Sequence, residues 1–259
     1  MSHLPISIQR HISDLKGEVG FVVHHLNTGQ KWIYNDRLFL AASTIKLPIM
    51  AAFFSACEQE VIDLGGSLIF QREVLVEDSP AMANLAEARE VSYLELIHWM
   101  ITVSDNTATN LVIELLRLER IQEWITSQGF LAMKLQRKMM DLQARSQGIE
   151  NWTTPMDMSY FMERLIRGQL VSPEACQRML AILYQQEDRE KIPALLVPPI
   201  KVANKPGELP TIRSDVGYVH DEHQEIVLSI FCDQLITEET ADEWIAKFAF
   251  EIWRHLIDL

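Results

Sequence analysis

Cysteine is scarce in this chain of 259 residues, which contains only Cys57, Cys176 and Cys232. The three lie far apart, and each stands in an apolar context. An odd number of cysteines without paired spacing excludes a disulfide framework and a zinc ribbon. We therefore expect buried free thiols.

Basic residues are also few, because 23 Lys and Arg stand against 36 Asp and Glu and leave a formal net charge of −13. The densest basic pair, Arg137-Lys138, lies among apolar residues. Nucleic acids and anionic membranes are bound through clustered positive charge. Neither is therefore expected as a partner.

Long apolar runs are absent as well. No stretch of about 18 apolar residues occurs, which excludes a membrane-spanning helix. The start, Met1-Ser2-His3-Leu4-Pro5, lacks the basic and apolar regions of a secretory signal peptide. As written, the chain is expected to be cytoplasmic, and an exported protein with a trimmed signal is the alternative.

The distribution of residue types predicts a single domain of the α/β (α+β) class. Residues that favour strands gather at 19–35 and again between 200 and 232, whereas residues 43–185 and 238–257 have helical patterns. We expect an antiparallel sheet built from both chain ends, flanked by terminal helices, in residues 1–42 and 193–259. An all-helical lobe, 43–192, would be inserted and packed on this sheet, with a site in the cleft between the two lobes.

The four residues Ser43-Thr44-Ile45-Lys46 directly precede an apolar stretch with no further charge until Glu58. Residues three apart share one face of a helix, so the Ser43 hydroxyl and the Lys46 amine can meet. The helix N-terminus also offers unpaired N–H groups and a positive dipole end. This combination is typical of a serine nucleophile with its base and with donors for an oxyanion.

A Ser-x-x-Lys sequence also arises by chance about once in a chain of this length. Ser13-Asp14-Leu15-Lys16 is such an occurrence, because its surroundings are polar and the following Gly17 fits an exposed helix end capped by glycine. The stretch after Lys46 is apolar nearly all round and is expected to be buried. A lysine at the head of a buried helix indicates a function.

Two further polar motifs follow along the chain. Ser104-Asp105-Asn106 joins two helical patterns, and in extended backbone Ser104 and Asn106 would point the same way while Asp105 braces the loop or caps the next helix. The alternative is a plain N-cap. Lys205-Pro206-Gly207 lies at the end of a predicted strand, where a strand end with a proline-led turn is the alternative.

No metal site and no cofactor are expected. His24-His25 alternates across a predicted strand, so the two rings face opposite sides and cannot share a metal. His220-Asp221-Glu222-His223 falls at the tip of a predicted hairpin. Polar residues are expected there in any case, so a solvated turn is predicted.

Taken in order, the three motifs resemble those of the class A β-lactamase and penicillin-binding protein superfamily of serine acyl-transferases. Segment 104–111 and the strand–helix–strand layout extend the resemblance over nearly the whole chain. It implies that Ser43 is acylated and that Lys46 is its base. Ser104 would relay a proton to the leaving nitrogen, and Lys205 would orient Ser104 and attract a substrate carboxylate. The implied substrate-binding residues are Asn106, Gly207, Arg213 and, near the strand N–H of the oxyanion hole, Leu209.

The chain departs from the family pattern at two places. Class A β-lactamases carry a loop Glu that activates the deacylating water, and when Arg137 is matched to the arginine of that loop, Met139 occupies the Glu position. Asp141 is the nearest carboxylate that could replace it, and Glu150 is a less favoured substitute. Pro206 stands where the family has Thr or Ser, which removes a hydroxyl and an N–H. Both changes are expected to weaken β-lactam turnover.

Three hypotheses follow. The favoured one is a serine hydrolase, acylated at Ser43 by β-lactams or related amides and esters, with weak deacylation. The second is a D-alanyl-D-alanine peptidase or transpeptidase-like enzyme, which uses the same motifs without the Glu. The third is a non-catalytic ligand-binding relative. In each, the partner is a small-molecule β-lactam or peptide-like compound.

Overall fold

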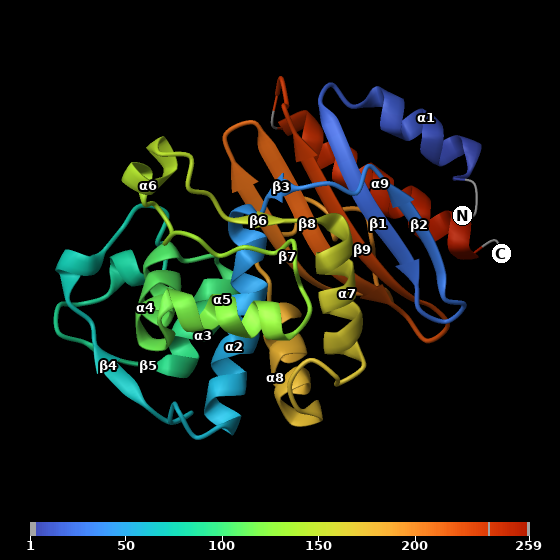
Figure 1. Ribbon diagram of the computed structural model, residues 1–259. Coiled ribbons are helices and arrows are strands. Elements are labelled where there is room, and N and C mark those ends of the chain that lie inside the picture. Colours follow the sequence, from blue (N-terminus) through green and yellow to red (C-terminus); the bar gives the residue numbers. More distant parts are fainter. Residues whose placement is uncertain (1–3, 238, 258–259) are drawn as a thin grey trace.

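A five-stranded antiparallel sheet with the strand order β2-β1-β9-β8-β7 dominates one side of the computed structural model, which describes residues 4–237 and 239–257 (Figure 1). The strands are β1 (Glu18–His25), β2 (Gln30–Tyr34), β7 (Lys201–Leu209), β8 (Ile212–His220) and β9 (Glu225–Asp233). The predicted sheet from both chain ends is therefore confirmed. Its β1–β2 and β8–β9 turns fall at the predicted Asn27-Thr28-Gly29 and Asp221-Glu222-His223.

The two faces of the sheet pack against different helices. Side chains alternate along a strand, and in β9 Ile230 packs toward α1 (Ile6–Asp14) and α9 (Glu239–Ile257), whereas Phe231 packs toward the other helices. Figure 1 shows α1 and α9 together on the far side of the sheet. The predicted final helix is thus α9, and residue 238 lies outside the described residues.

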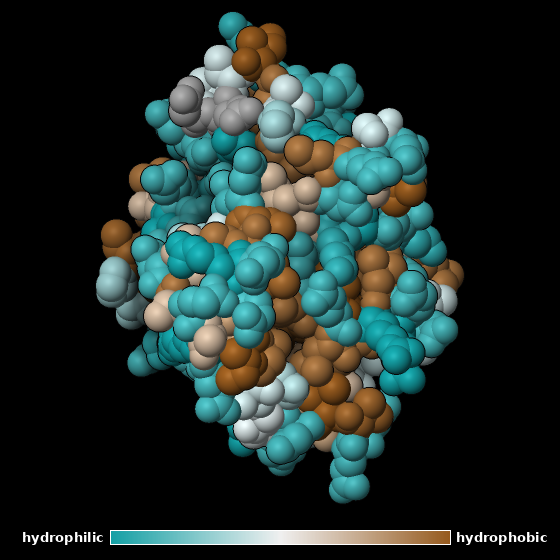
Figure 2. Space-filling model, turned by 90° about the vertical axis from the view of Figure 1, so that its left-hand side faces the viewer, coloured by the Kyte–Doolittle hydropathy of each residue, from teal (hydrophilic) through white to brown (hydrophobic). Residues whose placement is uncertain are grey.

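The second side of the molecule is mainly helical. Its helices are α2 (Lys46–Glu58), α3 (Tyr93–Thr102), α4 (Asn106–Leu116), α5 (Leu118–Ser127), α6 (Leu142–Ser146), α7 (Pro155–Ile166) and α8 (Pro173–Leu183), with 3₁₀ turns η1 (Ala42–Ile45), η2 (Arg72–Val74) and η3 (Met82–Asn84). Every residue from Lys46 to Phe54 is buried, which confirms the predicted buried helix. Seen from this side, the surface is mostly hydrophilic, with hydrophobic residues gathered in its lower half (Figure 2).

The helical side also contains short strands, so the prediction of an all-helical lobe is wrong in detail. Strand β4 (Ser67–Ile69) pairs with β5 (Glu90–Ser92), and β3 (Phe39–Leu40) pairs with β6 (Trp152–Thr153). Strands of two or three residues are too short for an alternating pattern to be recognised. The β3–β6 pair connects the residues just before η1 to the residues just before α7 through strand pairing.

The chance motif Ser13…Lys16 lies on the surface, as expected, because both side chains are exposed at the end of α1. Gly17 does not cap that helix, since the C-cap residue is Leu15 in an extended conformation. A Cβ on Gly17 would lie 2.8 Å from the Asp233 carbonyl oxygen, so the glycine permits a close approach of two backbones.

Cys176 and Cys232 are buried and Cys57 is partly exposed, all three as free thiols. Within the described residues, none of the helices combines the length and apolarity required to cross a bilayer.

Candidate active site

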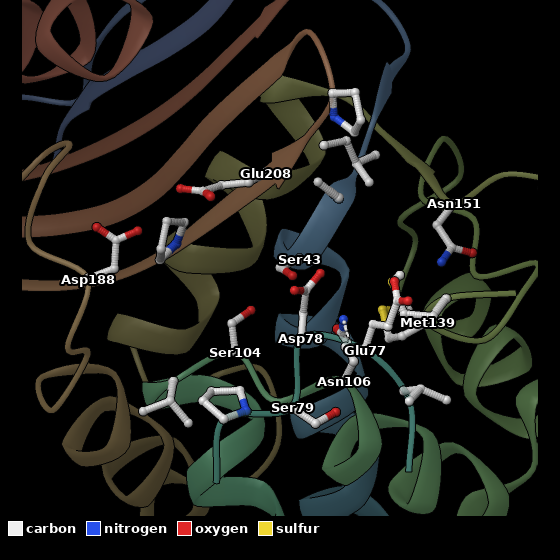
Figure 3. A pocket seen from close by; sticks show the side chains of 18 of the residues that line it. Ser43, Glu77, Asp78, Ser79, Ser104, Asn106, Met139, Asn151, Asp188 and Glu208 are labelled. Carbon is white, nitrogen blue, oxygen red and sulfur yellow. Dashed lines mark hydrogen bonds between the residues drawn. The ribbon is translucent and has the colours of Figure 1, made fainter. Parts of the chain in front are cut away.

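Ser43 lies in η1, beside a cleft of about 1320 Å³ that separates the β7 edge of the sheet from the helical side. The cleft is lined by Ser43, Ser104, Asn106 and Pro206, among others. Figure 3 shows Ser43 between Ser104 and Asn106 on one side and strand β7 on the other. The structure thus brings the three predicted motifs to one place.

Lys46 is the first residue of α2, and its side chain is fully buried. Its Nζ donates hydrogen bonds to the Ser104 carbonyl oxygen at 2.6 Å, to Ser104 Oγ at 3.0 Å and to Asn106 Oδ1 at 2.8 Å. Among the described residues, no hydrogen bond joins Lys46 Nζ to Ser43 Oγ. The amine is therefore held by the Ser104-Asp105-Asn106 loop, one helical turn from the nucleophile.

The electrostatic surroundings of Lys46 favour its neutral form. Burial, and next the positive charge of Lys205, hold the pKa of Lys46 well below its usual value of 10.5, although Asp105 and Asp78 oppose this shift. A lysine whose pKa is lowered gives up its proton more readily than a lysine in water, and the deprotonated amine has a free lone pair. Lys46 is therefore able to act as a general base.

The backbone of the Ser104-Asp105-Asn106 motif differs from the extended conformation that was predicted. Ser104 has a φ of 56° and Asn106 opens α4, so the segment is not the extended backbone of the prediction. Asp105 does both of its predicted tasks. Its Oδ1 accepts from Ala108 N at 2.8 Å as the α4 N-cap, and its Oδ2 accepts from the N–H groups of Ala81 and Met82.

Lys205 approaches the same serine from β7. Its Nζ donates to Ser104 Oγ at 3.0 Å and to the Pro206 carbonyl oxygen at 2.9 Å. Burial lowers the pKa of Lys205 to about 8, while Asp215 and other carboxylates oppose the shift. Ser104 thus lies between two lysine amines and can pass a proton between a lysine and a leaving group.

The pKa of Lys205 predicts a pH limit for acylation. Lys205 carries its charge below about pH 8 and loses it above that pH, so acylation of Ser43 by a β-lactam is expected to fall about tenfold between pH 7 and pH 9. The measurement is the second-order rate constant for acylation as a function of pH. Lys205→Arg keeps its charge over this range and should remove the falling limb. If the same limb persists in Lys205→Arg, another group is titrating.

Gly207 allows β7 to pass directly beside the nucleophile. A Cβ at this position would lie 2.6 Å from Ser214 Oγ, 3.1 Å from Thr44 Cγ2 and 3.2 Å from the Ala42 Cβ. Any larger residue would therefore push the strand away from the two neighbours of Ser43. Gly207 shapes the site through backbone approach.

The register of β7 turns the N–H of Glu208, and not that of Leu209, toward the cleft. Strand β7 is at the edge of the sheet and pairs with β8. Pro206 lacks an N–H, so its nitrogen faces the open edge. Nitrogens two residues apart face the same way, so the Glu208 N–H also faces the cleft while the Leu209 N–H faces β8. Glu208 follows the Lys-Pro-Gly motif directly, which is the signal that could have identified it.

Arg213 lines the cleft, as predicted, but its guanidinium already has partners within the protein. Its Nε lies 3.4 Å from Asp242 Oδ2, and its Nη1 donates to the carbonyl oxygens of Leu209 and Ile212. A substrate carboxylate would have to compete with Asp242 for this guanidinium.

The loop that should carry a deacylating carboxylate presents Met139 to the cleft. Asp141 is not a lining residue; instead its Oδ1 caps α6 by accepting from Ala144 N at 2.9 Å. Glu150 does line the cleft, but it is paired with Arg137 at 2.6 Å and with Arg145 at 3.3 Å. Both candidate substitutes for the missing Glu are thus engaged elsewhere.

Removal of the Asp141 carboxylate should therefore leave the chemistry intact. Asp141→Ala is expected to change the deacylation rate less than about twofold and to lower the free energy of unfolding by about 1 kcal/mol, as for a lost N-cap. Acyl-enzyme lifetime and denaturant unfolding would be measured together. A lifetime lengthened tenfold or more would make Asp141 a catalytic base after all.

Within the described residues, no group of three or more His, Cys, Asp or Glu side chains is arranged to hold a metal ion. The ring of His220 instead forms a hydrogen bond of 2.6 Å with the Tyr184 hydroxyl.

Two lysines that share one serine hydroxyl beside a second serine at the head of a buried helix define a serine enzyme that transfers acyl groups. The model of the β-lactamase enzyme family matches residues 5–256, so the chain belongs to this family and is a serine β-lactamase-like hydrolase. The family resemblance expected from the three motifs is confirmed. Family membership does not favour the peptidase alternative.

Individual relatives agree with this assignment. β-Lactamase AER-1 of Aeromonas hydrophila is 27% identical over 205 residues, which cover 78% of this chain and 67% of AER-1. A β-lactamase structure from Sphaerobacter thermophilus DSM 20745 matches with a TM-score of 0.92 and 26% identity, over 99% of both chains. A point mutant of PBP-A, solved as an acyl-enzyme complex with penicillin G, shares the fold with a TM-score of 0.89 and 24% identity, over 98% of this chain and 96% of PBP-A.

Proposed function

We propose that this protein is acylated at Ser43 by β-lactams or by related amides and esters, and that it releases the acyl group slowly. The observation that carries the proposal is the buried Lys46 amine, whose pKa is lowered and which reaches Ser104 and Asn106 beside Ser43. A mutant of PBP-A, a protein of the same fold, was solved as a penicillin G acyl-enzyme, which supports a small-molecule substrate of this kind.

In acylation, Ser43 Oγ would attack the substrate carbonyl while Lys46 Nζ takes its proton. The N–H groups of Ser43 and Glu208 would hold the oxyanion. As the tetrahedral intermediate collapses, the carbonyl C–N bond breaks and the nitrogen takes a proton from the Ser104 hydroxyl. Ser104 is then reprotonated from the Lys46 ammonium, and the product is an ester of Ser43.

Deacylation needs a water molecule and a base to accept its proton. Met139 provides no such group, and Glu150 is neutralised by two arginines. The ester of Ser43 should therefore persist. This is the reason that we expect accumulation of the acyl-enzyme instead of rapid turnover.

A chromogenic cephalosporin tests the proposal. We expect a burst of about one equivalent of chromophore per enzyme, followed by a much slower steady state. Rapid linear turnover without a burst would contradict slow deacylation, and no reaction at all would contradict acylation. In parallel, release of D-alanine from a peptide ending in two D-alanines would support the peptidase hypothesis instead.

A further inference from the structure

The residues that line the β7 end of the cleft are poorly suited to bind a carboxylate, and Lys205 of β7 is fully buried and not among them. Pro206 offers neither a hydroxyl nor an N–H, and Arg213 lies against Asp242. In register, Glu208 stands directly opposite Arg213 on the neighbouring strand. A negative side chain thus lies where an anionic substrate group would need a positive one.

Glu208 belongs to a cluster of charged side chains. The fully buried Lys191 lies 2.5 Å from Glu208 Oε1, 3.0 Å from Asp188 Oδ2 and 3.4 Å from Asp242 Oδ1. Three carboxylates therefore share Lys191 and Arg213. The charge of the fully buried Lys205 also interacts with Asp188 and Glu208, but Lys205 does not line the cleft, whereas Glu208 and Asp188 both do.

The opposite wall is acidic too. Glu77 and Asp78 are exposed, line the cleft and extend toward Ser43 and Met139 in Figure 3. Their backbone is bonded to Asn106 of the Ser104-Asp105-Asn106 loop. The Asn106 N–H donates to the Asp78 carbonyl oxygen at 3.1 Å, and Asn106 Nδ2 donates to the Glu77 carbonyl oxygen at 3.2 Å. Within residues 4–237 and 239–257, no ion pair joins either carboxylate to a cation. These two carboxylates therefore face the cleft, while Lys46, the lysine whose pKa the charge of Asp78 affects, is fully buried.

We propose that the cleft selects uncharged acyl substrates over those that carry a carboxylate beside the scissile bond. The proposal rests on acylation of Ser43 as described above and adds the charge of the preferred substrate. An anion entering between Glu208 and Asp78 meets like charge from both sides, and burial of that charge in the cleft strengthens the repulsion. A neutral amide or ester of the same shape does not meet this barrier.

Penicillin G and its methyl ester form a matched pair of probes, because they share one β-lactam ring and differ in one carboxylate. The rate of adduct formation on Ser43 would be followed by intact mass. We expect the ester to acylate the wild type at least about tenfold faster than the acid. Raising the salt concentration should narrow the gap by speeding the acid alone, since salt screens exposed charges.

Two variants test the two walls separately. Asp78→Asn removes an exposed carboxylate for which no ion pair is found in residues 4–237 and 239–257, and Asp188→Asn leaves Lys191 with two carboxylate partners, Glu208 and Asp242. Each should speed acylation by the acid about three- to tenfold and change acylation by the ester less than twofold. Glu174→Gln, at an exposed position in α8 outside the cleft, is the matched control and should change neither rate.

Equal rates for the two probes, or a faster acid, would overturn the charge preference while leaving acylation of Ser43 intact. An adduct with neither probe would instead defeat the proposed function itself. If Asp188→Asn does not fold, Asp78→Asn and the salt dependence still decide the question.

Discussion

Met139→Glu is expected to shorten the lifetime of the acyl-enzyme about 100-fold or more, the contribution typical of a positioned general base. Met139 lines the cleft and is 8% exposed, and Glu has a side chain of similar length. Its backbone is clamped by Asn110, which accepts from the Met139 N–H at 2.8 Å and donates to its carbonyl oxygen at 3.0 Å. A carboxylate placed there would be held in position and able to take a proton from water.

The measurement is the decay of the Ser43 adduct after excess β-lactam is removed, followed by intact mass. Met140→Glu is a matched control, because it puts the same carboxylate one residue later on the same loop. We expect that variant to retain the long lifetime of the wild type. If Met139→Glu is as slow as Met140→Glu, the loop does not hold water near the ester, and the account of the missing base is wrong.

Lys46→Met is expected to lower the rate of Ser43 acylation about 1000-fold, within the range lost with a general base. The variant keeps an unbranched side chain of similar length in the buried space but cannot accept a proton. It also removes the lysine donor from the Ser104 carbonyl oxygen and from Asn106 Oδ1, so the folded fraction must be measured alongside the rate.

Lys46→Arg separates the base from the positive charge. Arginine keeps the cation and its hydrogen-bond donors but does not lose a proton in proteins. We therefore expect Lys46→Arg to be as poorly acylated as Lys46→Met. If Lys46→Arg retains acylation within tenfold of the wild type, the lysine acts as a fixed cation, and the role of its lowered pKa is refuted.

Much of the architecture is predictable from local patterns. The sheet is predicted by the alternating strands at both chain ends, and the central helix by the uninterrupted apolar stretch after Lys46. Only a few arrangements of strands and helices can bury these apolar side chains. The three motifs meet at one cleft even though the expected backbone of Ser104 was wrong. The positive φ of Ser104 could not be predicted, because a polar Ser-Asp-Asn sequence is equally compatible with extended backbone.

The parts that were not predictable depend on pairing between distant residues. The cluster of Lys191 with Glu208 and Asp242 arises from the register of β7 on β8 and the position of α9. The same register turns the Glu208 N–H, and not that of Leu209, toward the cleft. Asp141 is different, since an aspartate that accepts from the N–H three residues later follows the ordinary N-cap rule and could have been recognised.

The central claim is that Ser43 becomes acylated and remains so. Incubation of the wild type and of Ser43→Ala with a chromogenic cephalosporin, followed by intact mass and by mapping of the modified peptide, tests it directly. We predict one stable adduct on Ser43 of the wild type and none on Ser43→Ala. An unmodified wild type, or an adduct that survives in Ser43→Ala, would contradict the account.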